Sequence, residues 1–121
     1  MARFGLLAVA GALGVLSRYG LAQAVGPRSF PWTTLGINVV GSFLLGVVLA
    51  GPLVAAWPGD VTTAISVGFL GAFTTYSTFA FETTSLLRDG RAGTAFAYVA
   101  ASLGAGLAAS ALGYVVGRAL S

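Results

Sequence analysis

The chain has 121 residues, of which 57% are hydrophobic and only 7% are charged. An average soluble domain has about 25% charged residues, so this composition excludes a soluble monomer and a disordered tail. Histidine, lysine and cysteine are absent, which excludes disulfide frameworks, thiolate metal sites and the usual general base. The net charge of +3 arises from six arginines and three acids, too few for a nucleic-acid surface.

The apolar stretches fit four membrane spans, since a spanning helix needs about 20 mostly apolar residues. We expect one all-α membrane domain over residues 1–121, with spans near residues 4–25, 33–54, 61–87 and 93–120. The connecting segments are rich in turn-forming residues. Trp32 and Trp57 fall at span ends, where indole rings prefer the membrane interface.

The first span has an alternative interpretation. Arg3, the apolar run that follows and the triplet Ala22-Gln23-Ala24 resemble a signal peptide with its cleavage site. Arg18 and Gln23 interrupt that run just before the site. We therefore favour a retained span.

The arginines show almost no orientation bias. Arg3 and Arg118 flank one side of the membrane, and Arg28, Arg88 and Arg91 flank the other. Because cytoplasmic loops normally carry an excess of Lys and Arg, this chain is predicted to insert in both orientations and to pair with an inverted copy. The alternative is a weak bias that the insertion machinery resolves.

Polar residues share one face of the second span. Thr34, Asn38 and Ser42 follow one another at intervals of four residues. The Asn38 amide supplies two uncharged N–H donors, which could replace the hydration shell of an anion. The alternative is a hydrogen bond that joins two helices, which is common in membrane bundles.

The third span contains the strongest signal, in residues 68–79 (GFLGAFTTYSTF). Glycine, serine and threonine weaken a helix interior, so we predict a helix break within residues 72–77. The carbonyl end of the first half would suit a cation, and the N–H end of the second half would suit an anion. The alternative is a kinked but continuous helix.

The fourth span carries Tyr98, Ser102 and Ser110 at helical spacing, with Gly106 in the intervening position. The row indicates either a polar track along one wall or a packing face of small residues. Arg18 and Glu82 are the two charges inside spans. They could form an ion pair, or each could line an aqueous vestibule.

Residues 11–19 (GALGVLSRY), 34–43 (TLGINVVGSF) and 68–79 together resemble the Fluc (CrcB-type) fluoride channels, in order over three of the four spans. The resemblance implies a non-enzymatic, multi-pass protein of the prokaryotic plasma membrane that passively exports toxic fluoride. It further implies an antiparallel, dual-topology homodimer with two pores.

The resemblance also implies roles for individual residues. A structural sodium ion at the dimer axis would be held by the backbone carbonyls of Gly71 and Thr74. Tyr76 and Phe79 would present ring edges to fluoride, and an aromatic ring edge is positive. The other expected pore and anion-binding residues are Arg18, Thr34, Asn38, Ser77, Thr78, Glu82, Tyr98, Ser102 and Ser110.

The sequence departs from the family pattern at three positions. Tyr76 stands where a phenylalanine is usual, Gly106 replaces a hydroxyl, and Ala72 replaces a glycine. These departures raise an alternative function, a half-active or non-conducting partner subunit of a heteromeric channel. A small multidrug exporter is disfavoured, because the first span carries Arg18 and no acid.

Overall fold

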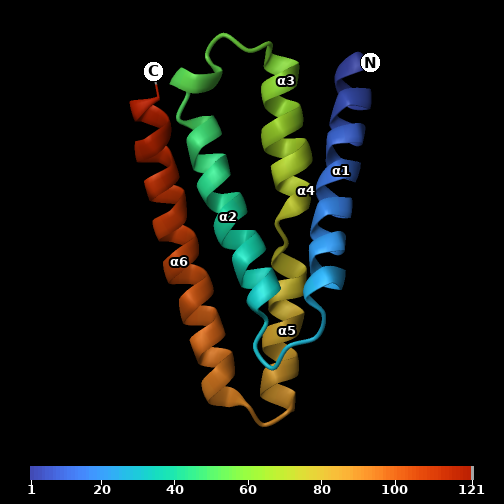
Figure 1. Cartoon of the computed structure of the whole chain (residues 1–121), viewed down its shortest axis with the longest axis vertical. Helices are drawn as coiled ribbons and strands as arrows, with labels where there is room; N and C mark the ends of the chain where they lie inside the picture. The colour runs from blue at the N-terminus through green and yellow to red at the C-terminus, as the bar shows by residue number, and fades with distance from the viewer. Residues whose placement is uncertain (121) are drawn as a thin grey trace.

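A computed structural model describes residues 1–120 as an all-helical bundle (Figure 1). Its elements are α1 Ala2–Val25, α2 Trp32–Leu49, η1 Pro52–Val54, α3 Gly59–Thr63, η2 Ala64–Leu70, α4 Gly71–Phe73, α5 Tyr76–Arg88 and α6 Ala92–Ala119. Four segments are long and apolar enough to cross a membrane, namely α1, α2, the stretch Gly59–Arg88 and α6. The termini lie at one end of the bundle and the α5–α6 turn lies at the other (Figure 1).

The second span is shorter than the sequence suggests, because α2 ends at Leu49 and not near residue 54. Gly51 has a φ of 103°, a conformation that side chains other than glycine rarely adopt. Pro52 then begins the short helix η1, since its fixed φ suits the first position of a helix. An expectation based on hydropathy alone cannot detect this stop, because residues 50–54 remain apolar.

The third span is not a uniform α-helix. Its segment Ala64–Leu70 is a π-helix, which the sequence did not indicate. α4 ends at Phe73, and the next two residues have extended backbone, with ψ of 161° at Thr74 and 122° at Thr75. α5 begins at Tyr76. This interruption lies within residues 72–77, the segment in which the sequence predicts a helix break.

Glycines permit close contacts between the helices. A Cβ atom on Gly14 of α1 would overlap the backbone of Phe69 in the third span, and one on Gly68 would lie 3.0 Å from the Cβ of Ala10. Between α2 and α6, a Cβ on Gly46 would lie 2.5 Å from the carbonyl oxygen of Ser110. Small residues at contacts are how membrane helices approach one another.

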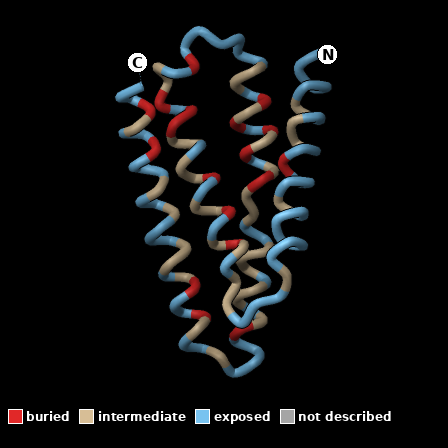
Figure 2. Tube along the Cα trace, in the orientation of Figure 1, coloured by how far each residue is buried: buried red, intermediate tan, exposed pale blue. Residues whose placement is uncertain are grey.

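Much of the surface is apolar. The only buried residue of α1 is Gly14, and large side chains such as Leu13, Leu107 and Tyr114 are exposed on the outer helices. Figure 2 shows buried residues mainly along the inner sides of α2 and the third span. Such a surface must face lipid or another protein, because contact between this much apolar surface and water would be unfavourable.

Candidate ion-binding groove

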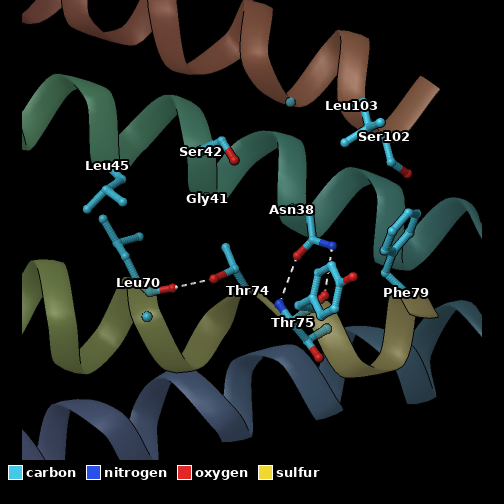
Figure 3. A pocket seen from close by; sticks show the side chains of 13 residues that line it. Asn38, Gly41, Ser42, Leu45, Leu70, Thr74, Thr75, Phe79, Ser102 and Leu103 are labelled. Carbon is cyan, nitrogen blue, oxygen red and sulfur yellow. Dashed lines mark hydrogen bonds between the residues drawn. The ribbon is translucent and has the colours of Figure 1, made fainter. Parts of the chain in front are cut away.

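A groove of about 310 Å³ lies beside the interruption of the third span (Figure 3). It is bounded by α2, α6, the end of η2 and the first turn of α5. Its lining residues are Asn38, Gly41, Ser42, Leu45, Leu70, Gly71, Thr74, Thr75, Tyr76, Phe79, Ser102, Leu103 and Gly106. None of these residues carries a charge, so polar contacts in the groove come from amide, hydroxyl and backbone groups.

Asn38 clamps the extended backbone of the interruption. Its Oδ1 accepts a hydrogen bond of 2.8 Å from the Thr75 N–H, and its Nδ2 donates one of 3.0 Å to the Thr75 carbonyl (Figure 3). Both backbone groups would otherwise lack a helical partner, and an unpaired group inside a membrane protein is costly. Asn38 therefore joins α2 to the third span while its second Nδ2 hydrogen stays available to the groove.

Some carbonyl groups near the interruption accept hydrogen bonds and others do not. The Leu70 carbonyl accepts from both the N–H and the Oγ1 of Thr74, each at 3.1 Å, and the Ala72 carbonyl accepts from Arg18 Nε at 3.2 Å. Within residues 1–120, the carbonyls of Gly71 and Thr74 accept no hydrogen bond. Both residues line the groove. Free carbonyl oxygens at an unwound helix suit a hard cation such as sodium.

The N-terminal end of α5 begins directly after these carbonyls. Thr75 Oγ1 accepts a hydrogen bond from the Thr78 N–H at 3.3 Å and so caps the helix. Tyr76 and Phe79 line the groove from the first turn, with ring centroids 6.0 Å apart. A helix N-terminus carries partial positive charge, as do aromatic ring edges. This side of the groove therefore favours an anion.

α6 contributes Ser102 and Gly106 to the opposite wall. Ser102 Oγ is buried and has no hydrogen-bond partner in the described part of the chain. A buried hydroxyl without a partner costs free energy, so this oxygen is positioned to bind a group that enters the groove. A Cβ on Gly106 would meet no atom within 4 Å, which leaves the wall open there.

A profile of the CrcB-like protein family (Camphor Resistance, CrcB) matches residues 5–114. The chain belongs to the CrcB family. A relative from Thermus thermophilus is 45% identical, over 99% of this chain and 98% of its own length. Relatives from Geobacter sp. strain M21 and Deinococcus radiodurans are each 46% identical, over 94% of this chain and 95% and 94% of their lengths. All three are named fluoride-specific ion channel FluC.

Membership of the CrcB family, together with four apolar spans, makes the chain a multi-pass protein of a prokaryotic plasma membrane. Of the residues singled out in the sequence, the groove brings six together. They are Asn38, Gly71, Thr74, Tyr76, Phe79 and Ser102. The remaining expected residues lie elsewhere.

Four of those remaining residues, all with hydroxyl groups, are not among the lining residues. Ser77 and Ser110 are exposed, and Thr34 is buried. Thr78 is engaged with the cap, because its hydroxyl accepts a hydrogen bond from Thr75 Oγ1 at 3.0 Å. Of the row Tyr98, Ser102, Gly106 and Ser110 in the fourth span, only the two central residues, Ser102 and Gly106, line the groove.

Of the two alternatives for Arg18 and Glu82, the ion pair is not found within residues 1–120. Arg18 donates from α1 to the Ala72 carbonyl, whereas Glu82 Oε1 accepts from the Tyr98 hydroxyl of α6 at 2.9 Å. The two side chains therefore bind groups on different helices, α4 for Arg18 and α6 for Glu82. Tyr98 is fully buried and is not among the residues that line the groove.

Two residues of the groove with polar side chains, Thr75 and Ser42, were absent from the expected site residues. Thr75 supplies the helix cap and both backbone groups that Asn38 binds. Its signal was available, since a threonine directly before the first turn of a helix is typical of an N-cap. The spacing had placed Ser42 on the polar face of Asn38, but it had not been included among the expected site residues.

Proposed function

We propose that this chain is a passive fluoride channel. The observation that carries the proposal is the groove at the interruption, where uncharged donors, ring edges and a helix N-terminus converge. It is supported by relatives of similar length that are named fluoride-specific ion channels. Those names describe a channel and not an enzyme, so we assign the chain no catalytic role.

The groove offers fluoride a substitute for its hydration shell. Asn38 Nδ2 and Ser102 Oγ would donate hydrogen bonds, and the edge of Phe79 would add weaker electrostatic attraction. No arginine or lysine lines the groove. Conduction requires an ion to bind well enough to enter and weakly enough to leave. Neutral donors meet both requirements better than a fixed cation in contact with the ion.

We further propose that two inverted copies meet at the interruption, in an antiparallel dimer. The exposed apolar surface and the even distribution of arginines across the two bundle ends support this arrangement. The free carbonyls of Gly71 and Thr74 would hold a structural sodium ion at the dimer axis. A bound cation supplies positive charge that lowers the cost of an anion in a low-dielectric pore.

Tyr76 supports a second candidate, a partner subunit with an impaired pore. Its side chain is 80% exposed and lines the groove, so its hydroxyl adds a polar group to a wall that is otherwise aromatic. A heteromeric channel would then draw its main conductance from a different chain. The two candidates differ in one measurable respect, which is whether this chain conducts by itself.

The test is fluoride efflux from proteoliposomes that hold this chain alone, followed with a fluoride electrode and without a proton gradient. A potassium ionophore would balance charge, and chloride efflux from matched vesicles would report selectivity. We expect fluoride to leave and chloride to stay. A folded dimer without fluoride efflux would overturn the channel proposal and favour the partner subunit.

A further inference from the structure

A second hollow lies at the end of the bundle opposite the termini. It has a volume of about 220 Å³, and its lining residues come from the α1–α2 loop, the C-terminal half of α5 and the α5–α6 turn. These three segments lie at that end of the bundle (Figure 1). Since a water molecule occupies about 30 Å³ in the liquid, the hollow admits a group much larger than one ordered water. No residue that lines it also lines the ion-binding groove.

The hollow concentrates charge in a chain that has very little. Arg28, Glu82, Asp89 and Arg91 all line it, two positive and two negative side chains. The whole sequence has only six arginines and three acids. Within residues 1–120 these four side chains form no ion pair with one another. Unpaired charges of both signs around one hollow are suited to a ligand that itself carries both signs.

The hollow lies at the level of the lipid headgroups. Arg28, Asp89 and Arg91 lie outside the helices, just beyond the ends of three spans. Trp32 begins α2 at the same end and is 62% exposed, and an exposed tryptophan at a span end marks the membrane interface. Phe81, which lines the hollow from α5, is 66% exposed and extends its wall onto an apolar outer surface.

From this arrangement we propose that the hollow binds the headgroup of a zwitterionic phospholipid with a primary ammonium group, as in phosphatidylethanolamine. Arg28 and Arg91 bind the phosphate, because the guanidinium fork matches phosphate oxygens. Glu82 and Asp89 accept hydrogen bonds from the ammonium. Phe81 contacts the glycerol and the start of an acyl chain. This inference does not depend on fluoride conduction.

The same charges discriminate among headgroups. The quaternary ammonium of phosphatidylcholine has no N–H donor, so it can donate no hydrogen bond to either carboxylate, and Glu82 keeps only the bond from Tyr98. Phosphatidylglycerol has no cation at all and would leave both acids unneutralised. Each missing charge-assisted hydrogen bond weakens binding about tenfold or more. The site therefore selects for the number of N–H groups on the amine.

Native mass spectrometry of the purified, detergent-solubilised protein tests the proposal. The protein is titrated with phosphatidylethanolamine, its mono- and dimethylated forms and phosphatidylcholine, all with the same acyl chains. We expect affinity to fall at each methylation and to be at least about tenfold lower for phosphatidylcholine. Equal affinity across the series would overturn the proposal.

Two pairs of matched variants locate the site. Arg91→Gln is expected to weaken phosphatidylethanolamine binding about tenfold, whereas Arg88→Gln, with the same charge change on an exposed residue outside the hollow, is expected to have no effect. Asp89→Asn should reduce the preference over phosphatidylcholine, and Asp60→Asn at the other end of the bundle should retain it. Equal effects within either pair would contradict the assignment.

Soluble competitors separate a lipid from a free phosphate compound. We expect free phosphoethanolamine to displace the lipid only at far higher concentration, since it lacks the contact with Phe81, and inorganic phosphate to be weaker still. Displacement by inorganic phosphate and phosphoethanolamine at the same concentration would show that the ammonium plays no part, and would overturn the proposal. Unchanged gel-filtration profiles and melting temperatures would confirm that each variant is folded.

Discussion

The two halves of the third span are held in place in different ways. The half before the interruption is packed, with Ala64, Leu70 and Phe73 buried and Gly68 in close contact with α1. The half after it, α5, has Leu86 as its only buried residue, and its Phe81 is 66% exposed. Polar contacts position α5 instead: Asn38 to Thr75 at one end and Tyr98 to Glu82 further along.

This difference explains where the groove forms. The groove opens where the packed first half ends, and the sparse packing of α5 leaves Tyr76 and Phe79 accessible to it. In a membrane protein, close packing replaces the hydrophobic effect as the force between helices. A half-span without close packing must be positioned by hydrogen bonds. The polar side chains that form those bonds also provide the groups that an ion needs.

The largest effect is expected from Asn38→Ala, which removes the polar support of α5. The Thr75 N–H and carbonyl would both lose their partner, and each unpaired group costs about 1–3 kcal/mol. We expect a clearly lower melting temperature and loss of nearly all fluoride efflux. The control is Ser42→Ala in the same groove, expected to keep the fold. An unchanged melting temperature for Asn38→Ala would contradict the clamp.

A smaller effect is expected from Gly14→Val, which tests the packed half. The new side chain would overlap the backbone of the third span, and overpacking costs about 1–3 kcal/mol. Gly20→Val makes the same change in the same helix where no atom lies within 4 Å. Thermal unfolding should separate the two variants. Equal melting temperatures would show that α1 does not hold the first half.

Thr75→Val tests the helix cap at the junction of the two halves. Loss of the side-chain acceptor for the Thr78 N–H is expected to cost about 1 kcal/mol and to loosen the first turn of α5. Thr75→Ser keeps the hydroxyl and should retain most of the stability and fluoride efflux. If both variants behave alike, the hydroxyl does not act as a cap.

The smallest effect is expected from Tyr76→Phe, which removes one hydroxyl from the groove and leaves the ring edge. We expect fluoride efflux to rise roughly two- to fivefold, with an unchanged melting temperature, because the side chain is 80% exposed. Tyr19→Phe, on exposed surface of α1, is the matched control. Equal or slower efflux for Tyr76→Phe would show that the hydroxyl does not obstruct the ion.

The sequence predicted features that depend on local composition. Hydropathy indicated four spans, and the run of hydroxyls around Thr74 and Thr75 indicated the place of the interruption. Spacing placed Asn38 and Ser102 on faces that do line the groove. The hydrogen-bond partners of the charged side chains could not be predicted in this way. Arg18 and Glu82 each bind a group on a different neighbouring helix, which no spacing within one helix could indicate.

By itself, the sequence determined the membrane class, the number of spans and the weak point of the third helix. All three follow from the free-energy cost of placing polar groups in lipid. For each segment, that cost depends only on the residues of the segment itself. The tertiary structure was needed to show that Asn38 binds the backbone of Thr75, that Tyr98 binds Glu82, and that Arg28 lines one hollow with the charges of α5 and the α5–α6 turn. Those outcomes depend on which helices become neighbours, and that is set by packing between segments far apart in the chain.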